Sequence, residues 1–298
     1  MFRFATYLGT LALLVPSLAI AEDPTTYRIG VSKSMYRDVP TELVRLAGQP
    51  FQDLMKAQMG LTGEMVPATE AMETARAIDA GKLHLGVFPG HEFAWAKEKY
   101  PDLQPLICSV YRPKEIHAVI LVRYDCKATT LAEMKDSKLS LSPTLKDHAR
   151  LFWERMRAEE MEGPTPCAPK KVANVHEAIN SLIDGEVDVT VADHADWSYF
   201  EKLYPGPAKN VKVLARSEEF PQTVLVYKKG SLSEETIAKI RNGFLTAHEN
   251  PKAGRMMKMI RIDRFSTIPD TYDESLRTCL KLYPKPKPSP FNTYFCSI

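Results

Sequence analysis

The amino-acid sequence predicts an α/β fold of two similar lobes joined by two crossing strands. The first observation is an alternation of strand-like and helix-like segments, which is typical of parallel sheets with right-handed crossovers. The second is a strand–helix–strand–helix–strand unit that occurs twice. The third is a pair of apolar strands, 117–123 and 222–227, each long enough to run from one lobe to the other.

The first 21 residues differ from the rest of the chain. Arg3 is the only charged residue before Glu22, residues 8–20 are almost wholly apolar, and 19–21 has the small-x-small pattern of a signal peptidase site. An uncleaved membrane anchor is the alternative, because the apolar stretch is about the minimum length for a membrane span. Pro16 and the cleavage pattern favour removal after Ala21, so we expect an exported protein.

The composition of the 298 residues is that of a globular protein, with 44% apolar and 26% charged residues. The net charge of +2 comes from 39 basic and 37 acidic residues spread along the chain, and no basic block with interleaved aromatics occurs. We therefore expect no nucleic-acid partner. The nucleophile elbow, the phosphate-binding loop, the dinucleotide-binding glycine motif and the His-Glu-x-x-His motif are missing from the sequence. This pattern favours a binding protein without a cofactor over an enzyme.

The cysteines suit an exported protein, because disulfides persist outside the cytoplasm. There are five: Cys108, Cys126, Cys167, Cys279 and Cys296. Their spacings match no zinc pattern. A bridge between Cys279 and Cys296 is the preferred interpretation, since it would hold a Pro-rich C-terminal tail; the other connectivities stay open.

The repeated unit sets the expected lobes. In the first copy we expect strands at 27–31, 64–68 and 83–87, with helices at 41–59 and from Thr69 to Ala80. In the second copy we expect strands at 138–141, 170–172 and 187–191, with helices starting at Thr144 and Asn174. In both copies the second helix ends at a glycine just before the last strand. The first lobe is then 22–118 plus 222–270, the second lobe 119–221, and the tail 271–298.

Several short motifs resemble one family of exported receptors. They are 81–90 with its Phe-Pro-Gly turn, 117–125 ending in Arg-x-Asp, 131–135, 175–178 and 185–188. With these motifs, the chain from about 28 to 265 resembles the solute-binding subunits of phosphate, phosphite and phosphonate ABC importers, which have the type 2 periplasmic binding protein fold.

The resemblance implies a periplasmic protein that closes a cleft on a small molecule and passes it to an ABC permease, meeting the membrane only through that partner. The implied ligand is a phosphonate- or phosphate-like oxyanion or an aminophosphonate. Two alternatives stay open: a ligand-sensing module for a membrane signalling partner, and a metal-binding solute receptor.

One segment departs from the family pattern. Where the family has a Ser-Thr-Ser-Gly cluster at a helix start, this chain has Thr144-Leu145-Lys146-Asp147-His148. Only Thr144 supplies a hydroxyl there, and a carboxylate in the first helical turn repels an incoming anion. Lys146 and His148 are the residues that can compensate. The departure favours a ligand with a weak phosphoryl requirement.

The other candidate ligand contacts lie at strand ends and helix starts. His176 begins a helix, and the resemblance implies that it touches the ligand; a surface histidine is the alternative. Asp193 and Asp196 follow the last strand of the second lobe and could hold an ammonium group or hydroxyls, or form a solvated turn. Tyr36 and Phe88 could wall the ligand, or belong to the core.

The histidines raise the alternative of a metal site. The candidates are His84, His91, His148, His176 and His194, together with Asp193. No two of these histidines have a ligand spacing such as i, i+4, so we assign no metal site.

Overall fold

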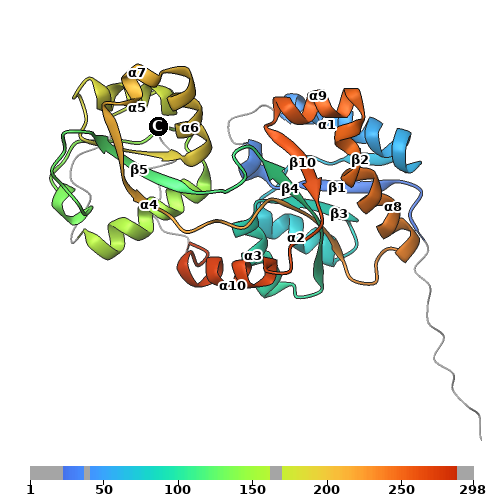
Figure 1. Ribbon diagram of the computed structural model, residues 1–298. Helices are drawn as coiled ribbons and strands as arrows, with labels where there is room; N and C mark the ends of the chain where they lie inside the picture. Colours follow the sequence, from blue (N-terminus) through green and yellow to red (C-terminus); the bar gives the residue numbers. More distant parts are fainter. Residues whose placement is uncertain (1–22, 37–40, 162–169, 287–298) are drawn as a thin grey trace, which may run out of the picture.

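The computed structural model describes residues 23–36, 41–161 and 170–286. The predicted signal peptide, 1–21, lies outside the described residues. Figure 1 shows two lobes side by side, with the large sheet in the first and the small sheet in the second. Within the described ranges, no helix is both long and apolar enough to cross a membrane.

The described strands form two sheets, one of six strands and one of four. The order in the large sheet is β10 (Ile262–Ser266), β4 (Leu103–Tyr111), β9 (Val224–Lys228), β3 (Leu85–Phe88), β1 (Tyr27–Val31) and β2 (Gly63–Met65). The order in the small sheet is β6 (Leu139–Ser140), β7 (Val189–Asp193), β5 (Ala118–Arg123) and β8 (Val211–Arg216).

The strand directions decide which loops lie at the same edge of each sheet. β1 is parallel to β2 and β3, and β9 runs antiparallel between β3 and β4. The carboxyl ends of β1, β3 and β4 therefore share one edge of the large sheet. In the small sheet β6 and β7 are parallel, so their carboxyl ends also share an edge. Ligands of α/β sheets bind beyond such edges.

Helices cover both faces of each sheet. One face of the large sheet packs under α1 (Thr41–Leu54), its continuation η2 (Met55–Met59), α8 (Glu234–Leu245), η4 (Ala247–Glu249) and α9 (Pro251–Met259). The other face packs under α2 (Ala71–Asp79), α3 (Gly90–Lys99) and α10 (Tyr272–Leu282). In the second lobe, η3 (Ala132–Met134) and α4 (Asp147–Glu160) cover one face, and α5 (Val175–Ile183), α6 (His194–Leu203) and α7 (Pro205–Ala208) cover the other.

The repeat seen in the sequence is present in the structure except for one strand. The strand expected at 170–172 was wrong: only Lys170 pairs there, in an isolated bridge with Ser140. Gly81 and Gly185 follow α2 and α5 with φ of 70° and 73°, a left-handed conformation that glycine adopts without steric cost. Asn174 caps α5 as expected: its side chain accepts a hydrogen bond from the backbone N–H of Glu177 at 3.0 Å. The two lobes thus end their second helix in the same way.

The expected cap at Thr144 was wrong. α4 begins at Asp147 with Lys146 as its N-cap. The Thr144 hydroxyl instead lies 2.9 Å from the Ser142 hydroxyl, because the chain forms a turn before the helix starts.

Two connections between the lobes are confirmed, but the strands do not themselves cross. β5 lies wholly in the small sheet and β9 wholly in the large one. Segments 112–117 and 217–223 make the crossings, visible between the lobes in Figure 1. They pair with each other: the Phe220 N–H donates to the Ile116 carbonyl at 2.8 Å, and the Ser217 N–H to the Ala118 carbonyl at 2.9 Å. A paired double crossing is suited to act as a hinge.

Part of the expected C-terminal tail is helix α10, which packs against α3. The residue after it, Tyr283, lies 4.5 Å ring to ring from Phe220 and donates through its hydroxyl to Glu218 at 2.8 Å. Trp95 of α3 donates its indole N–H to the Tyr283 carbonyl, also at 2.8 Å. This part of the tail is therefore held by packing between the lobes.

The expected disulfide between Cys279 and Cys296 stays a prediction. Cys279 lies on the buried side of α10 as a free thiol, and burial raises its pKa to about 12. Cys296 lies outside the described residues.

Candidate functional site

Polar side chains from both lobes meet where the two sheet edges face each other. We call this set the interlobe cluster; its members are Ser32, Glu92, Tyr111 and Arg261 in the first lobe and Ser142, Lys146, His148, Asp193 and Asp196 in the second. The ion pair between Arg261 and Asp196, at 2.7 Å, joins the two sides directly. The charges of Lys146 and Asp193 also act on the Tyr111 hydroxyl, and that of Asp147 acts on Glu92.

Asp193 is the centre of the second-lobe side. It ends β7, its side chain is 4% exposed, and it accepts hydrogen bonds from the Lys146 ammonium and from His148 Nε2, the latter at 3.2 Å. Burial alone would raise the pKa of Asp193, but the bonds and charges of His148 and Lys146 hold it well below its usual range. The carboxylate is therefore occupied by its neighbours, and it positions Lys146 and His148.

Lys146 keeps a ligand-binding capacity after pairing with Asp193. Its side chain is 48% exposed, and an ammonium group has three N–H donors. Burial would lower the pKa of Lys146, but the charges of Asp193 and Asp196 raise it, so the ammonium stays protonated. Lys146 is the best-placed anion contact of the cluster.

Hydroxyl groups beside Lys146 are more numerous than the sequence segment 144–148 indicated. Ser142, the second residue after β6, is buried. Its hydroxyl lies against the hydroxyl of Thr144, a residue that is exposed. Arg150 holds this turn by donating to the carbonyls of Leu145 at 2.9 Å and Pro143 at 2.6 Å. The sequence places the loop 142–148 at the cleft but does not single out Ser142, which lies before the segment compared with the family.

The first-lobe side contributes an unusual carboxyl group. Glu92 lies in the first turn of α3, is buried, and accepts a hydrogen bond from the Ser32 hydroxyl at 2.5 Å. Burial raises the pKa of Glu92 to about 7, and the charges of Asp147 and Glu70 act in the same direction, while hydrogen bonds from serine hydroxyls oppose the shift. Near neutral pH this group is present both as a carboxylic acid and as a carboxylate. The sequence offered only its place after the Phe-Pro-Gly turn.

Next to Glu92, His91 is buried and packs edge-on against Trp95 and Phe220, with ring centroids 5.3 and 6.3 Å away. Burial, helped by the charge of His148, lowers the pKa of His91 to about 3. The imidazole is thus neutral and belongs to the hinge packing.

Asp196 of α6 bridges the lobes. Its carboxylate accepts from Arg261 at 2.7 Å, and the Arg261 guanidinium lies 5.2 Å over the Tyr199 ring. Arg261, between α9 and β10, has φ of 59°, a left-handed conformation uncommon for arginine. In this structure Asp196, expected to touch a ligand, is engaged by the first lobe.

We predict that breaking this ion pair opens the lobes in the absence of ligand. Arg261→Asn removes the guanidinium but keeps a residue that tolerates positive φ. A partly exposed pair contributes about 0.5–1 kcal/mol, so the open-to-closed ratio should rise about two- to fivefold. Small-angle scattering should show a larger radius of gyration, and Asp196→Asn should do the same. Unchanged scattering curves for both variants would contradict the bridging role.

The remaining predicted site residues lie elsewhere. His176, half-buried on α5, stacks on Tyr199 at 5.9 Å and meets Phe200 at 5.6 Å, so its contacts are with α6. Phe88 is fully buried in the core against Phe93, and its role as a ligand wall was wrong, because it points to the sheet face covered by α2 and α3. Tyr36 ends η1 (Lys33–Tyr36), and its side chain lies outside the described residues.

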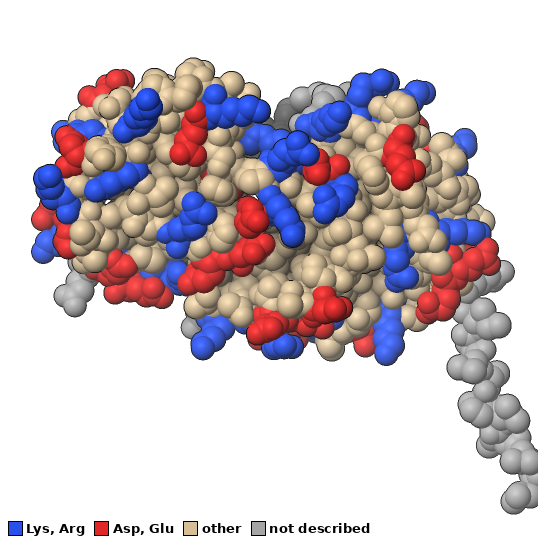
Figure 2. All heavy atoms as spheres, viewed as in Figure 1, with Lys and Arg blue, Asp and Glu red and all other residues tan. Residues whose placement is uncertain are grey.

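Charge on the visible surface is mixed. Figure 2 shows Lys and Arg interspersed with Asp and Glu over both lobes, with no extended area of one sign. Across the described ranges, no three His, Cys, Asp or Glu side chains are grouped so that they could hold a metal ion.

The family comparison covers most of the chain. The model of the periplasmic substrate-binding proteins of phosphonate ABC transporters matches residues 39–272. A comparison with curated protein sequences finds no match.

Solved structures share the fold. XAC2383 from Xanthomonas citri, solved bound to ATP, has 16% identity and a TM-score of 0.64 over 87% of this chain and 97% of its own. PhnD1 from Prochlorococcus marinus, in complex with methylphosphonate, has 14% identity and a TM-score of 0.60 over 87% and 98%. A binding protein component of an ABC phosphonate transporter from Pseudomonas aeruginosa has 15% identity and a TM-score of 0.57 over 86% of each chain. At these identities the likeness shows the fold alone.

The fold is that of the type 2 periplasmic binding proteins. Given the family match, the chain belongs to the periplasmic substrate-binding proteins of phosphonate ABC transporters. It is a solute-binding protein for an ABC importer, as the sequence predicted. The comparisons give no support to a sensing module or a metal receptor.

Proposed function

We propose that this protein binds a small phosphonate-like oxyanion in the interlobe cluster, closes its lobes on it, and delivers it unchanged to an ABC permease. The observation that carries the proposal is the set of Lys146, His148 and Asp193, in which a half-exposed lysine is held by a buried carboxylate at the face of the second lobe. An ammonium anchored by a buried carboxylate is a pre-organised anion contact, because its position costs little entropy on binding.

The neighbouring groups complement an oxyanion. Thr144 and Ser142 bring two hydroxyls to the same turn, and the neutral form of Glu92 can donate a hydrogen bond from the other lobe. These donors offset the loss of the family's serine–threonine cluster. We therefore revise the expectation of a weak phosphoryl requirement toward a phosphonate group bound mainly by Lys146.

Closure about the paired segments 112–117 and 217–223 would bring Glu92 and Lys146 onto one ligand. The signal peptide cleaved after Ala21 and the periplasmic delivery to a permease are part of the same proposal. Nothing in the cluster requires a chemical step on the ligand.

Titration calorimetry of the mature protein tests the proposal. We expect binding of methylphosphonate or phosphate, and a 10- to 100-fold weaker affinity for Lys146→Gln, because a charge-assisted hydrogen bond contributes about 1.5–3 kcal/mol. Lys202→Gln, an exposed lysine of α6, is the matched control and should bind normally. No binding of any oxyanion by the wild type would refute the function, and equal affinity of Lys146→Gln would refute the site.

A further inference from the structure

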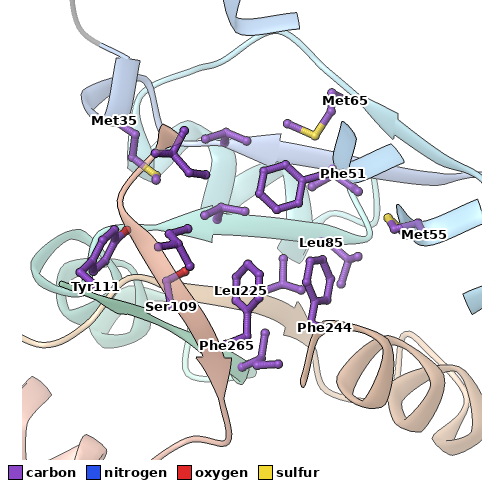
Figure 3. Close-up of a pocket in the computed structure, with 16 residues that line it drawn as sticks. Met35, Phe51, Met55, Met65, Leu85, Ser109, Tyr111, Leu225, Phe244 and Phe265 are labelled. Atoms are coloured by element: carbon purple, nitrogen blue, oxygen red, sulfur yellow. The ribbon is translucent and has the colours of Figure 1, made fainter. Parts of the chain in front are cut away.

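An apolar cavity of about 80 Å³ lies in the first lobe, between one face of the large sheet and its covering helices. Figure 3 shows its lining side chains converging from the sheet and from the helices that cover it. Phe51, Met55 and Phe244 lie at its inner end, and Met35 and Tyr111 lie toward the other end. Its described lining has polar side-chain atoms only on Ser109 and Tyr111.

The cavity reaches the edge of the sheet that faces the second lobe. Val87 and Tyr111 stand at or next to the carboxyl ends of β3 and β4, and Ile262, which pairs with Tyr111, starts β10. The Tyr111 hydroxyl donates to Thr223 of the hinge at 2.9 Å, and the charge of Lys146 acts on the same hydroxyl. The outer end of the cavity is therefore next to the proposed anion contact.

The chemistry of the lining favours an apolar occupant. A buried water needs two to four polar partners, and the Tyr111 hydroxyl already donates to Thr223. Protein interiors are close-packed, and an unfilled void destabilises a fold. A void of this size at the ligand edge, beside half-buried Val87 and Met35, is the shape of a subsite that a ligand completes.

We infer that the ligand carries a short unbranched apolar chain that enters this cavity while its oxyanion lies at Lys146. The inference rests on the proposed function, which it extends from the head group to the substituent. If each carbon takes roughly the 30 Å³ of a water molecule, the cavity accepts about three carbons. The substrate class is then the short n-alkylphosphonates.

A chain-length series tests the inference. Methyl-, propyl-, butyl- and hexylphosphonate are titrated into the wild-type protein. Affinity should rise about fourfold per added carbon up to butyl, from the burial of each methylene, and stop rising at hexyl. Equal or falling affinity from methyl to butyl would overturn the inference and leave the proposed function intact.

Substitutions that fill the cavity test whether the gain in affinity with chain length arises there. Val87→Phe should remove most of the gain from methyl to butyl while methylphosphonate still binds, and Ser109→Val does the same with a smaller change of volume. Val213→Phe, at a site 36% exposed on β8 of the second lobe, is the matched control and should keep the full gain. A gain that persists in both filling variants would contradict the cavity as the subsite.

A further experiment tests the apolar chain independently of the head group. If no phosphonate binds, the proposed head group is wrong, and the same chain-length series is run as n-alkylsulfonates, carboxylates and amines by thermal shift. A chain-length dependence that Val87→Phe removes would uphold the cavity, and its absence for every head group would overturn it.

Discussion

Replacing Asp193 with Asn should lower the free energy of unfolding by about 3 kcal/mol at pH 7. The carboxylate is buried, paired with the Lys146 ammonium and hydrogen-bonded to His148, and the amide keeps its volume but not its charge. The variant leaves the Lys146 ammonium without its partner, so ligand affinity should fall as well. Urea unfolding followed by tryptophan fluorescence measures the loss, because Trp153 and Trp197 both lie in the second-lobe cores.

The pH dependence of unfolding shows whether the lost stability comes from the charge of Asp193. Because the folded pKa of Asp193 is depressed, its stabilisation is fully present above the unfolded pKa, near 4, and is lost as the pH falls toward the folded value. The difference between wild type and Asp193→Asn should therefore shrink below pH 4. Asp184→Asn, an exposed aspartate after α5, is the control and should match the wild type at both pH values. An equal loss at pH 3 and pH 7 would mean that the effect is packing and not charge.

Glu92→Gln should act in the opposite direction on stability. The folded pKa of Glu92 is raised to about 7 from 4.5, so the wild type is most stable at low pH and loses stability as the pH rises from about 4.5 to 7. Glutamine does not titrate and can still accept from Ser32. The variant should be more stable than the wild type by up to about 3 kcal/mol above pH 7, with no difference below pH 4.5.

Binding should follow the same group. Above pH 7 the Glu92 carboxylate repels an oxyanion, whereas the amide of the variant can still donate a hydrogen bond. The wild-type affinity for methylphosphonate should therefore fall relative to that of Glu92→Gln between pH 6 and 8; titration of the ligand itself is common to both proteins and cancels. Glu98→Gln, exposed on the same helix, is the control. Parallel stability profiles for wild type and Glu92→Gln would show that the carboxyl is not titrating in this range.

The lobes could be predicted because their signals are local. Alternating strands, helices that end at Gly81 and Gly185, and the Asn174 cap each depend on residues within a few positions of one another. The carboxyl-end loops of parallel strands then indicated where to look for the site. Asp193 was a candidate for this reason, and Lys146 and His148 were candidates because they stand where the family has hydroxyl groups. The pairing of these three side chains was not predicted.

Other assignments failed where burial decided the outcome. Phe88 is the last residue of β3, at the end of the strand where a ligand contact is expected. The pleat of the strand nevertheless turns its ring into the core under α2 and α3. Alternation along a strand does not say which face the helices will cover. The same limit applies to α10, which lies in the expected tail and whose apolar residues pack against both lobes.

The sequence by itself determined the class of this protein: two αβ lobes, two crossings and loops at the carboxyl ends of parallel strands. Only the tertiary structure decided which side chains meet, since Ser32 bonds to Glu92 across 60 residues, Lys146 to Asp193 across 47 and Asp196 to Arg261 across 65. Such pairs leave no periodicity in the chain, because they arise from the docking of separate elements. The cavity beside Lys146 has the same origin: its lining comes from strands and helices far apart in the sequence, and only their packing leaves the space open.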